Sequence, residues 1–362
     1  MTPLAWNDIA VVLHPGIAEH VMPFPRPHLE SFETPLRVEM IRRHLRTRGI
    51  FKHVRVARAR MATVENLRRV HTDYMIDTVR IMSDLGAGEV GESAYASPEL
   101  YRSALMAVGG AIRAATLVAK EESRHSFSVM RPPGHHATSS TPMGLCYFNN
   151  IAVAIRHIQT KYEVRRVSIL DFDDHFGNGT AEIFYSDPDV QYISIHEYDY
   201  DDYGMGHFSE TGSGDAEGTN INIPLLEHST DESYSLALRE VVVPAIEAHQ
   251  PEVIAVSAGF DSHYADPVGN MNIDSSTFWL IGNTVRELVE SVGARGSFWV
   301  LEGGYNPLVL GPCVEASLAG LAGEEKPVFE DQVPREVSQG LLEANRRIIR
   351  RVREIALKRT HS

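Results

Sequence analysis

The segment DFDDHFGNGT, residues 171–180, combines carboxylates and an imidazole at a spacing that suits metal binding. It follows VRRVSIL, an apolar and β-branched run that is typical of a buried strand. Because side chains alternate faces along a strand, Asp171, Asp173 and His175 can project to one side. Carboxylate and imidazole ligands suit a first-row divalent ion such as Zn²⁺ or Fe²⁺. A solvated turn can have the same sequence, so the segment alone leaves both interpretations open.

Other predicted strands also end in side chains that could take part in catalysis or binding. An open parallel sheet binds its ligands beyond the carboxyl ends of its strands. The residues at those ends are His135 and His136 in RPPGHHA, residues 194–196, Asp261 in SAGFD, and residues 302–305, EGGY. So many reactive groups at strand ends indicate one shared site.

Adjacent histidines are poorly placed to bind one ion from a strand, because their side chains diverge. His135 and His136 are better placed to flank a reacting water as a base and an electrostatic partner, and a buried structural pair is the alternative. Asp261 ends an apolar strand and fits a third metal ligand, although an N-cap aspartate would look the same. Tyr305 follows two glycines. Its hydroxyl could donate to a substrate carbonyl or could be structural.

Together these residues could complete one reaction, the hydrolysis of an amide. An ion held by Asp173, His175 and Asp261 would keep open positions for water and a carbonyl oxygen. It would lower the pKa of that water toward about 7. His136 would take the proton and later protonate the leaving amine, while Tyr305 and the ion would stabilise the oxyanion. The residue set therefore predicts metal-assisted amide hydrolysis.

The composition is that of an ordinary globular protein, with 43% hydrophobic and 23% charged residues in 362. Its net charge of −14 argues against nucleic acid as a partner, because phosphate binding needs a basic surface. The two cysteines, Cys146 and Cys313, provide no disulfide framework and no thiolate zinc cluster. The N-terminus lacks a signal-peptide pattern, and no uninterrupted apolar run is long enough to span a bilayer. We therefore expect a soluble, cytoplasmic protein with no membrane partner.

Short apolar runs alternate with amphipathic segments from about residue 126 onward, which is the pattern of a parallel sheet with helices on both faces. We expect strands within residues 125–130, 164–173, 190–198, 251–261 and 296–305. We expect helices within residues 34–49, 97–122, 149–162, 232–250 and 275–292. A basic amphipathic segment at about 335–359 predicts a C-terminal helix packed on the core. Residues 1–362 are expected to form a single catalytic domain.

Five motifs, in order and spacing, resemble those of the zinc-dependent histone deacetylase and acetylpolyamine amidohydrolase superfamily. They are RPPGHHA, GLCYFNN, DFDDHFGNGT, SAGFD and LEGGYN. The similarity extends from about Pro35 to beyond Tyr305, and it is greater to the class II and bacterial-type branch than to class I. The resemblance implies the arginase/deacetylase α/β fold, a three-layer structure with a mostly parallel eight-stranded sheet flanked by helices.

The resemblance assigns a role to each matching residue. It implies Zn²⁺ as the catalytic ion, with Fe²⁺ as an alternative that the same ligands accept. The matching metal ligands are Asp173, His175 and Asp261. The matching catalytic residues are His135, His136 as the general base, and Tyr305. The matching outer partners are Asp171 behind His135 and Asn178 behind His136, which would set tautomer and basicity.

The resemblance also implies ions and surfaces around the catalytic site. A structural K⁺ would use Asp171, Asp173, His175, Ser194 and Ile195, partly through backbone carbonyls. A second, peripheral ion would lie near Phe184, Asp187, Val190 and Thr219. The carbonyl of Gly144 would accept the substrate amide N–H. Arg37, in the early Pro-Leu-Arg element, would line an internal channel.

Several positions depart from the family pattern. Phe176 replaces the second histidine of D-x-D-x-H-H-G, and we expect it to face away from the metal and to alter packing only. Leu145 replaces an aromatic wall of the acyl-lysine channel, which leaves Phe208 as the remaining substrate-binding wall and implies a wider channel. Val268 occupies a position at the rim of the channel where a polyamine-selective relative has glutamate. This difference argues against selection of polyamines by a carboxylate at that position.

The loop HEYDYDDYG carries Glu197, Asp199, Asp201 and Asp202 just past a predicted strand of the site. A solvated acidic turn is one explanation, and an anionic rim that attracts a polyamine or a lysine-rich peptide is the other. The expected partner is a small acetylated amine or an acetyl-lysine peptide, and the chain could assemble as a homo-oligomer. Cys146 is expected to pack as a small hydrophobe rather than to act as a nucleophile.

The sequence thus predicts a metal-dependent deacylase that releases acetyl or other acyl groups from amines. One alternative is a catalytically inactive acyl-ligand sensor or scaffold, which the intact set of ligands, base and tyrosine argues against. Another is a ureohydrolase of the arginase type, which needs additional bridging carboxylates and to which RPPGHHA and EGGY do not belong.

Overall fold

The centre of the protein is an eight-stranded sheet with strand order β2-β1-β5-β10-β9-β6-β7-β8. The computed structural model describes residues 6–16, 19–22, 32–201, 204–331 and 338–357. All neighbouring strands of this sheet pair in parallel. The strands are β1 (Ile9–Leu13), β2 (Arg55–Arg58), β5 (His125–Val129), β6 (Val167–Asp171), β7 (Val190–Glu197), β8 (Asn220–Leu225), β9 (Val253–Ala258) and β10 (Ser297–Leu301).

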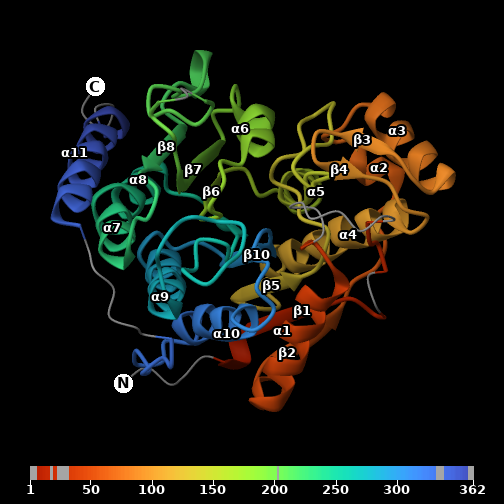
Figure 1. Ribbon diagram of the computed structural model, residues 1–362, viewed down its shortest axis with the longest axis horizontal. Helices are drawn as coiled ribbons and strands as arrows, with labels where there is room; N and C mark the ends of the chain where they lie inside the picture. The colour runs from red at the N-terminus through yellow and green to blue at the C-terminus, as the bar shows by residue number, and fades with distance from the viewer. Residues whose placement is uncertain (1–5, 17–18, 23–31, 202–203, 332–337, 358–362) are drawn as a thin grey trace.

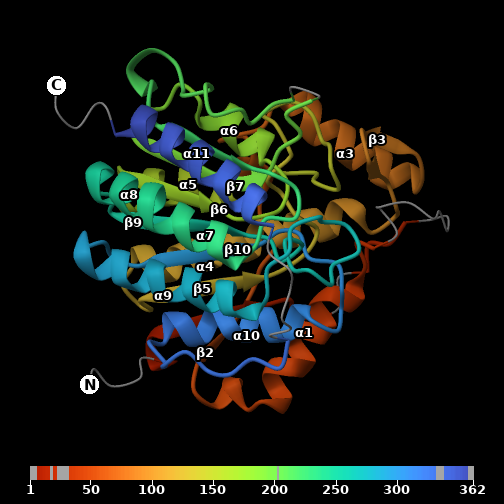
Figure 2. The same ribbon diagram turned by 60° about the vertical axis from the view of Figure 1, so that its left-hand side comes forward.

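Helices cover both faces of this sheet (Figure 1 and Figure 2). One face packs against α1 (Pro35–Thr47), α7 (Asp231–Ala237), α8 (Val243–His249), α9 (Ser275–Ser291), α10 (Leu310–Leu321) and α11 (Gln339–Ala356). The other face packs against α4 (Leu100–Ala119), α5 (Asn150–Tyr162) and α6 (Asn178–Phe184). The predicted three-layer α/β fold is therefore confirmed.

The alternation of side chains along each strand produces the two cores. On β1, Ile9 and Val11 belong to one buried cluster, while Ala10 and Val12 belong to the other. All four residues are fully buried, which explains the continuous apolar run in the sequence.

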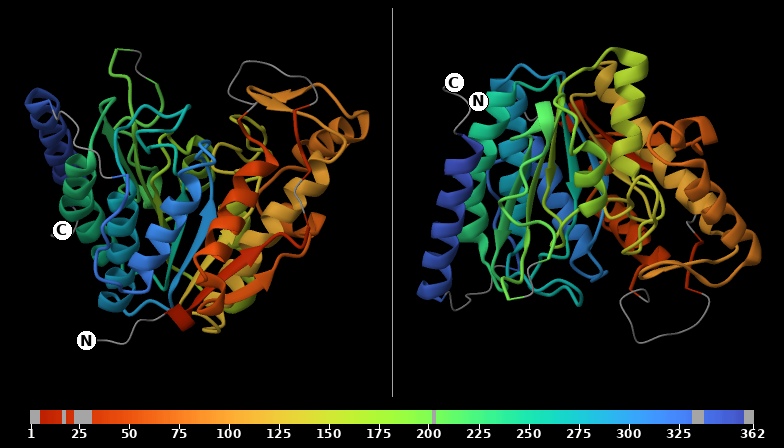
Figure 3. Two further views of the ribbon diagram at one scale, coloured as in Figure 1. Left: turned by 60° about the horizontal axis from the view of Figure 1, so that its bottom comes forward. Right: turned by 90° about the horizontal axis from the view of Figure 1, so that it is seen from above.

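A smaller lobe packs on α4 and contains α2 (Val64–Leu67), α3 (Asp73–Leu85) and the two-stranded antiparallel pair of β3 (Glu89–Gly91) and β4 (Ala94–Tyr95). This lobe appears at one end of the molecule in both views of Figure 3. Short 3₁₀ turns lie at Trp6–Asp8, Ile50–Lys52 and Gly214–Ala216.

The sequence-based predictions missed three strands of the main sheet, β1, β2 and β8, and the small pair of β3 and β4. β2 (RVAR) and β8 (NINIPL) lack a continuous apolar run, whereas β1 (IAVVL) has one that was not assigned to a strand. The predicted helix at 232–250 is divided, since a π-helical turn, Leu238–Val242, joins α7 to α8. Pro244 stands in the first turn of α8, and its missing N–H interrupts the regular helical hydrogen bonding there.

Helix α4 is long and apolar enough, by length and composition, to cross a membrane. Of its most apolar window, 78% is buried inside the structure. Gly109 lets the backbone around Arg60 approach closely, because a Cβ atom at this glycine would lie 1.6 Å from the Arg60 carbonyl oxygen. This packing is that of a core helix.

Helix α11 lies within the predicted segment 335–359, of which residues 335–337 and 358–359 fall outside the described residues. It packs against β8 and α7. Asn345 is fully buried in this contact and donates to the Ser229 and Ser233 hydroxyls at 2.6 and 3.0 Å. Its carbonyl oxygen accepts the backbone N–H of Leu226 at 3.1 Å. One polar side chain thus connects α11 to the loop after β8 and to α7.

Replacing Asn345 by leucine should destabilise the protein by about 2 kcal/mol or more, because the Leu226 N–H would be buried without an acceptor. The measurement is the free energy of unfolding from urea titration. Arg347→Ala, a change at an exposed position of the same helix, should change it by less than about 0.5 kcal/mol. Equal effects of the two changes would show that Asn345 does not anchor α11.

Candidate metal centre and active site

The carboxyl ends of adjacent strands bring the predicted site residues together. β5, β10, β9 and β6 are neighbours in the sheet. Each is followed by a segment with chemically reactive groups, and these segments are residues 131–136, 302–305, 259–261 and 171–175. Because the strands are parallel, all four segments emerge at the same edge of the sheet. The predicted convergence of motifs is therefore observed.

Asp173, His175 and Asp261 form a compact group of potential metal ligands, with ligand atoms within 4.8 Å of one another. His175 Nδ1 lies 3.3 Å from Asp173 Oδ1 and 3.3 Å from Asp261 Oδ2. Asp261 Oδ2 is buried and receives no hydrogen bond. The two carboxylates are 1% exposed, whereas the His175 side chain is 41% exposed. The group thus opens toward solvent through His175, and its unsatisfied oxygen fits a cation.

Glycines give these ligands room. A Cβ atom at Gly259 would lie 2.1 Å from Asp173 Oδ2, and one at Gly303 would lie 2.0 Å from Asp261 Oδ2. The backbone N–H of Gly303 donates to Asp173 Oδ2 at 2.7 Å. Burial by itself raises the pKa of Asp173, but His135 and the hydrogen bonds from His175 hold that pKa well below its usual range. Asp173 is therefore ionised and ready to bind a cation.

The tandem histidines differ in their partners. His135 Nδ1 lies 3.2 Å from Asp171 Oδ2, and His136 Nδ1 lies 2.8 Å from Asn178 Oδ1. Their ring centroids are 4.1 Å apart. The predicted partners of both histidines are thus observed at hydrogen-bond distance.

These partners also separate the pKa values of the two histidines. Burial lowers the pKa of His136 to about 3, and the positive charges of His135 and His175 add to that effect. Burial also opposes the charged form of His135, but Asp173 and Asp171 outweigh it and raise the pKa of His135 to about 10. At neutral pH, His136 is therefore neutral and can act as a base, whereas His135 carries a proton on each nitrogen.

Tyr305 lies over the buried Arg37. The Arg37 guanidinium is 4.6 Å from the centre of the Tyr305 ring. Arg37 Nε donates to the Gly304 carbonyl at 2.6 Å, and its Nη2 donates to the Glu302 carbonyl. Burial raises the pKa of Tyr305 well above its usual value. The phenol therefore stays protonated, and Arg37 holds the loop that carries it.

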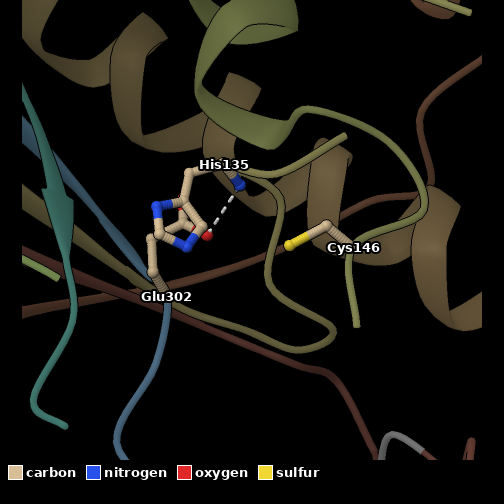
Figure 4. Close-up of side chains that lie close together, drawn as sticks. All are labelled: His135, Cys146 and Glu302. Atoms are coloured by element: carbon tan, nitrogen blue, oxygen red, sulfur yellow. Dashed lines mark hydrogen bonds between the residues drawn. The ribbon is translucent and has the colours of Figure 1, made fainter. Parts of the chain in front are cut away.

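Glu302 has a structural role that the sequence analysis did not assign. Its Oε2 accepts the N–H group of His135 at 3.1 Å (Figure 4). The same oxygen accepts the N–H group of Gly134 at 2.6 Å. Burial raises the pKa of Glu302 to about 7. This carboxyl group holds the histidine loop against the end of β10. The only indication of this role in the sequence was that Glu302 is the first residue of the EGGY motif.

Cys146 lies beside His135 and Glu302, and these three residues also have potential ligand atoms within 4.8 Å of one another (Figure 4). Burial raises the pKa of the Cys146 thiol well above its usual value, so the thiol is neutral. His135 and Glu302 are already hydrogen-bonded as described above. The surroundings of Cys146 agree with the predicted packing role.

Two further polar residues beside the site were not predicted. Tyr192 donates its hydroxyl to Asp171 Oδ2 at 3.0 Å. Asp174 is buried, and it accepts the Asn270 N–H at 3.0 Å and the Ser262 hydroxyl at 3.3 Å. Burial and the adjacent Asp261 raise the pKa of Asp174 well above its usual value, so it is a neutral acid. The positions of Tyr192 and Asp174 in the sequence do not indicate that they make these contacts.

The residues predicted to hold K⁺ are close in the structure, because Asp171 of β6 pairs with Ser194 of β7. The predicted peripheral site includes Asp187, whose N–H donates to the Phe184 carbonyl at 2.9 Å. The Asp187 carboxylate pairs with Arg156 at 2.5 Å. Both ion sites remain predictions.

The predicted substrate-contacting residues lie in different surroundings. Gly144 has φ +55° and approaches the His136 ring so closely that a Cβ atom would lie 2.5 Å from its Cδ2. Leu145 is half-buried with φ +66°, and its N–H donates to the Ser93 carbonyl at 2.9 Å. Phe208 packs against the larger core cluster and lines a small cavity with residues of α11. These contacts turn Phe208 toward α11, so its role as a channel wall remains a prediction that its packing does not support.

Phe176 packs against the rings of Tyr192 and His196, at centroid distances of 6.2 and 4.9 Å. The aromatic ring thus fills a space behind the site, in agreement with the expected packing role.

In the acidic loop, Glu197 accepts hydrogen bonds from Asn270, and Asp199 accepts the Asp201 N–H at 2.8 Å. Asp202 lies outside the described residues.

Comparison with known proteins agrees with this geometry. The family model for the histone deacetylase domain matches residues 31–321. The histone deacetylase-like amidohydrolase of Pseudomonas aeruginosa is 34% identical over 301 residues, which cover 83% of this chain and 78% of the relative. A probable deacetylase of Methanothermobacter thermautotrophicus is 38% identical over 290 residues, covering 77% of this chain and 85% of the relative.

The crystal structure of the HDA15 HD domain superposes with a TM-score of 0.86 at 29% identity, covering 98% of this chain and 96% of that chain. The matched domain includes every residue of the candidate site described above. This chain belongs to the histone deacetylase family.

Proposed function

We propose that this protein is a zinc-dependent deacylase that hydrolyses the amide of an acetylated amine, with acetyl-lysine peptides and acetylpolyamines as the substrate classes. Membership of the deacetylase family supports an amidohydrolase activity. One observation carries the finer proposal. Asp261 Oδ2 is buried, receives no hydrogen bond and lies 3.3 Å from His175 Nδ1, beside the ionised Asp173. The ring centroid of the neutral His136 is 6.1 Å from that of His175.

The ligand set fits a divalent ion, because two carboxylates and one imidazole leave coordination positions open. Zn²⁺ is the proposed ion, and Fe²⁺ suits the same ligands. When bound, such an ion polarises a carbonyl group and lowers the pKa of a water molecule. A structural K⁺ beside Asp171 and Ser194 is proposed from the same family pattern.

His136 is the proposed general base. Its Nδ1–H donates to the Asn178 side-chain oxygen, which leaves the Nε2 lone pair to accept a proton from water. The water oxygen forms a bond to the carbonyl carbon. The C–N bond then breaks, and His136 returns its proton to the departing amine nitrogen. The products are a carboxylic acid and a primary amine.

Tyr305 is the proposed donor to the carbonyl oxygen. Its phenol is protonated at neutral pH, and Arg37 beneath the ring adds positive potential where negative charge develops. His135, charged and held by Asp171, favours the same charge distribution. A substrate amine lying near the acidic loop would be attracted by Glu197 and Asp199.

The decisive test of the activity is steady-state hydrolysis of an acetyl-lysine peptide and of N-acetylputrescine by zinc-reconstituted protein. We expect turnover of at least one substrate, and a larger kcat/KM for one of them identifies the substrate class. Tyr305→Phe should lower kcat about a hundredfold to a thousandfold with a smaller change in KM, because it removes a donor to the oxyanion. A variant with unchanged kcat would exclude Tyr305 from catalysis, and no turnover of either substrate with zinc bound would contradict the proposed reaction.

The metal assignment is tested by Asp261→Asn. Zinc affinity should fall at least about a hundredfold, since losing a group that merely orients a ligand already costs about tenfold to a hundredfold. The measurement is zinc content after dialysis against a competing chelator. Asp174→Asn is the matched control, because this adjacent carboxyl group is already neutral, and it should keep its zinc. Equal retention by both variants would exclude Asp261 as a ligand.

The base assignment predicts a pH effect for Asn178→Asp. A carboxylate at 2.8 Å would favour the protonated imidazole and raise the pKa of His136 by about one to three units. Because only neutral His136 can act as the base, the acid limb of kcat/KM should move to higher pH. Asn178→Ala, which adds no charge, should not move the limb upward. An unchanged profile for the aspartate variant would argue against His136 as the base.

A further inference from the structure

A groove of about 730 Å³ lies along β2, at the edge of the sheet, and the proposed deacylase reaction does not use it. Strands β1, β5 and β10 separate β2 from the ligand-bearing strands β9 and β6. One side of the groove is formed by residues 55–62, and the other by Gly109, Ile112, Arg113 and Thr116 of α4. We call this hollow the β2 groove.

The β2 edge exposes backbone groups that can pair with another strand. β2 pairs only with β1, and the Ala59 N–H donates to the Leu13 carbonyl at 3.0 Å. Since successive residues of a strand turn their backbone groups to opposite sides, Val56 and Arg58 direct theirs toward the open edge. At the opposite edge strand, β8, the outward-facing Asn220 N–H donates to the Thr211 carbonyl, and Pro224 has no N–H to offer while its carbonyl accepts the Tyr200 hydroxyl. Only the β2 edge therefore offers a free ladder among the described residues of this sheet.

The β2 groove is also basic, although the whole chain has a net charge of −14. Arg55, Arg58, Arg60 and Arg113 line it. Arg55 pairs with Glu122 at 3.0 Å. Within the described part of the chain, the side chains of the other three arginines form no ion pair or hydrogen bond. Their charges are thus available to an anionic ligand.

Apolar side chains are exposed between these charges. Val56 is 47% exposed and Met61 is 52% exposed, and Ile112 of α4 is half-buried beside them. An extended peptide that carries both acidic and apolar side chains could place its carboxylates near the arginines and its apolar groups on this surface.

We propose that the β2 groove binds an extended acidic segment of a partner protein, which adds as a further strand to the edge of the sheet. A second copy of this chain is a poor occupant, because pairing β2 with itself would bring Arg58 and its neighbours against the same arginines. A nucleic acid would satisfy the charges, but it would not pair with the alternating N–H and C=O groups of Val56 and Arg58. Charged residues also guard edge strands against pairing, and the experiment separates these cases.

Fluorescence anisotropy of the full-length, zinc-loaded protein tests the proposal. The probe is a fluorescein-labelled octapeptide of alternating glutamate and valine, and the matched control peptide has lysine in place of glutamate. The acidic peptide should bind and the basic one should not. Binding should weaken as salt is raised, because the arginines are exposed to solvent.

Two variants separate charge from strand pairing. Arg58→Glu combined with Arg113→Glu should weaken peptide binding about tenfold or more. Arg347→Glu combined with Arg350→Glu, which makes the same charge change on exposed positions of α11, should not. Val56→Pro removes an N–H at the open edge, where proline is tolerated, and should also weaken binding while the melting temperature and deacylase activity are kept.

Each contrary outcome overturns the proposal. Absence of acidic-peptide binding would show that the arginines only guard the edge. Equal losses in the groove and α11 variants would make the attraction non-specific. Unchanged binding by a folded Val56→Pro variant would exclude strand addition. Tighter binding of a single-stranded RNA decamer that displaces the peptide would assign the groove to nucleic acid.

Discussion

Five carboxyl groups are buried together at the carboxyl edge of the sheet, and this concentration of acid controls the rest of the site. They belong to Asp171, Asp173, Asp174, Asp261 and Glu302. Unbalanced buried charge is costly, so each group needs a cation, a proton or hydrogen-bond donors. Asp174 is neutral, Asp171 is held by His135 and Tyr192, Glu302 accepts two backbone N–H groups, and the remaining pair faces His175. The charge and geometry of this last pair fit a divalent cation.

The same concentration of charge distinguishes the two histidines. His135 lies against Asp171 and close to Asp173, which favours its protonated form. His136 faces a neutral amide, so burial keeps it unprotonated. Two adjacent residues of one loop thus differ in charge, one positive and one neutral, because their partners come from β6 and from the start of α6. The difference between the protonated His135 and the neutral His136, which can accept a proton, is therefore a property of the assembled site.

The sheet uses its two long edges differently. At β8 the Thr211 carbonyl and the Tyr200 hydroxyl bind outward-facing backbone groups of the strand, and the buried Asn345 connects α11 to the loop after β8. β2 is open and basic in an acidic molecule. The candidate site residues follow the carboxyl ends of the central strands, so a surface for another protein at β2 would leave the candidate site accessible.

The sequence by itself determined the fold class and the central strands, and it predicted which candidate ligands and histidines lie together, because each motif directly follows an apolar run and local patterns carry that information. Strands β2 and β8 escaped prediction, since their polar residues are tolerated at sheet edges. Only the tertiary structure decided that Glu302 holds the histidine loop, that Asp174 is a neutral acid, and that Phe208 turns toward α11. These properties depend on burial and on contacts between residues far apart in the chain, which no local pattern specifies.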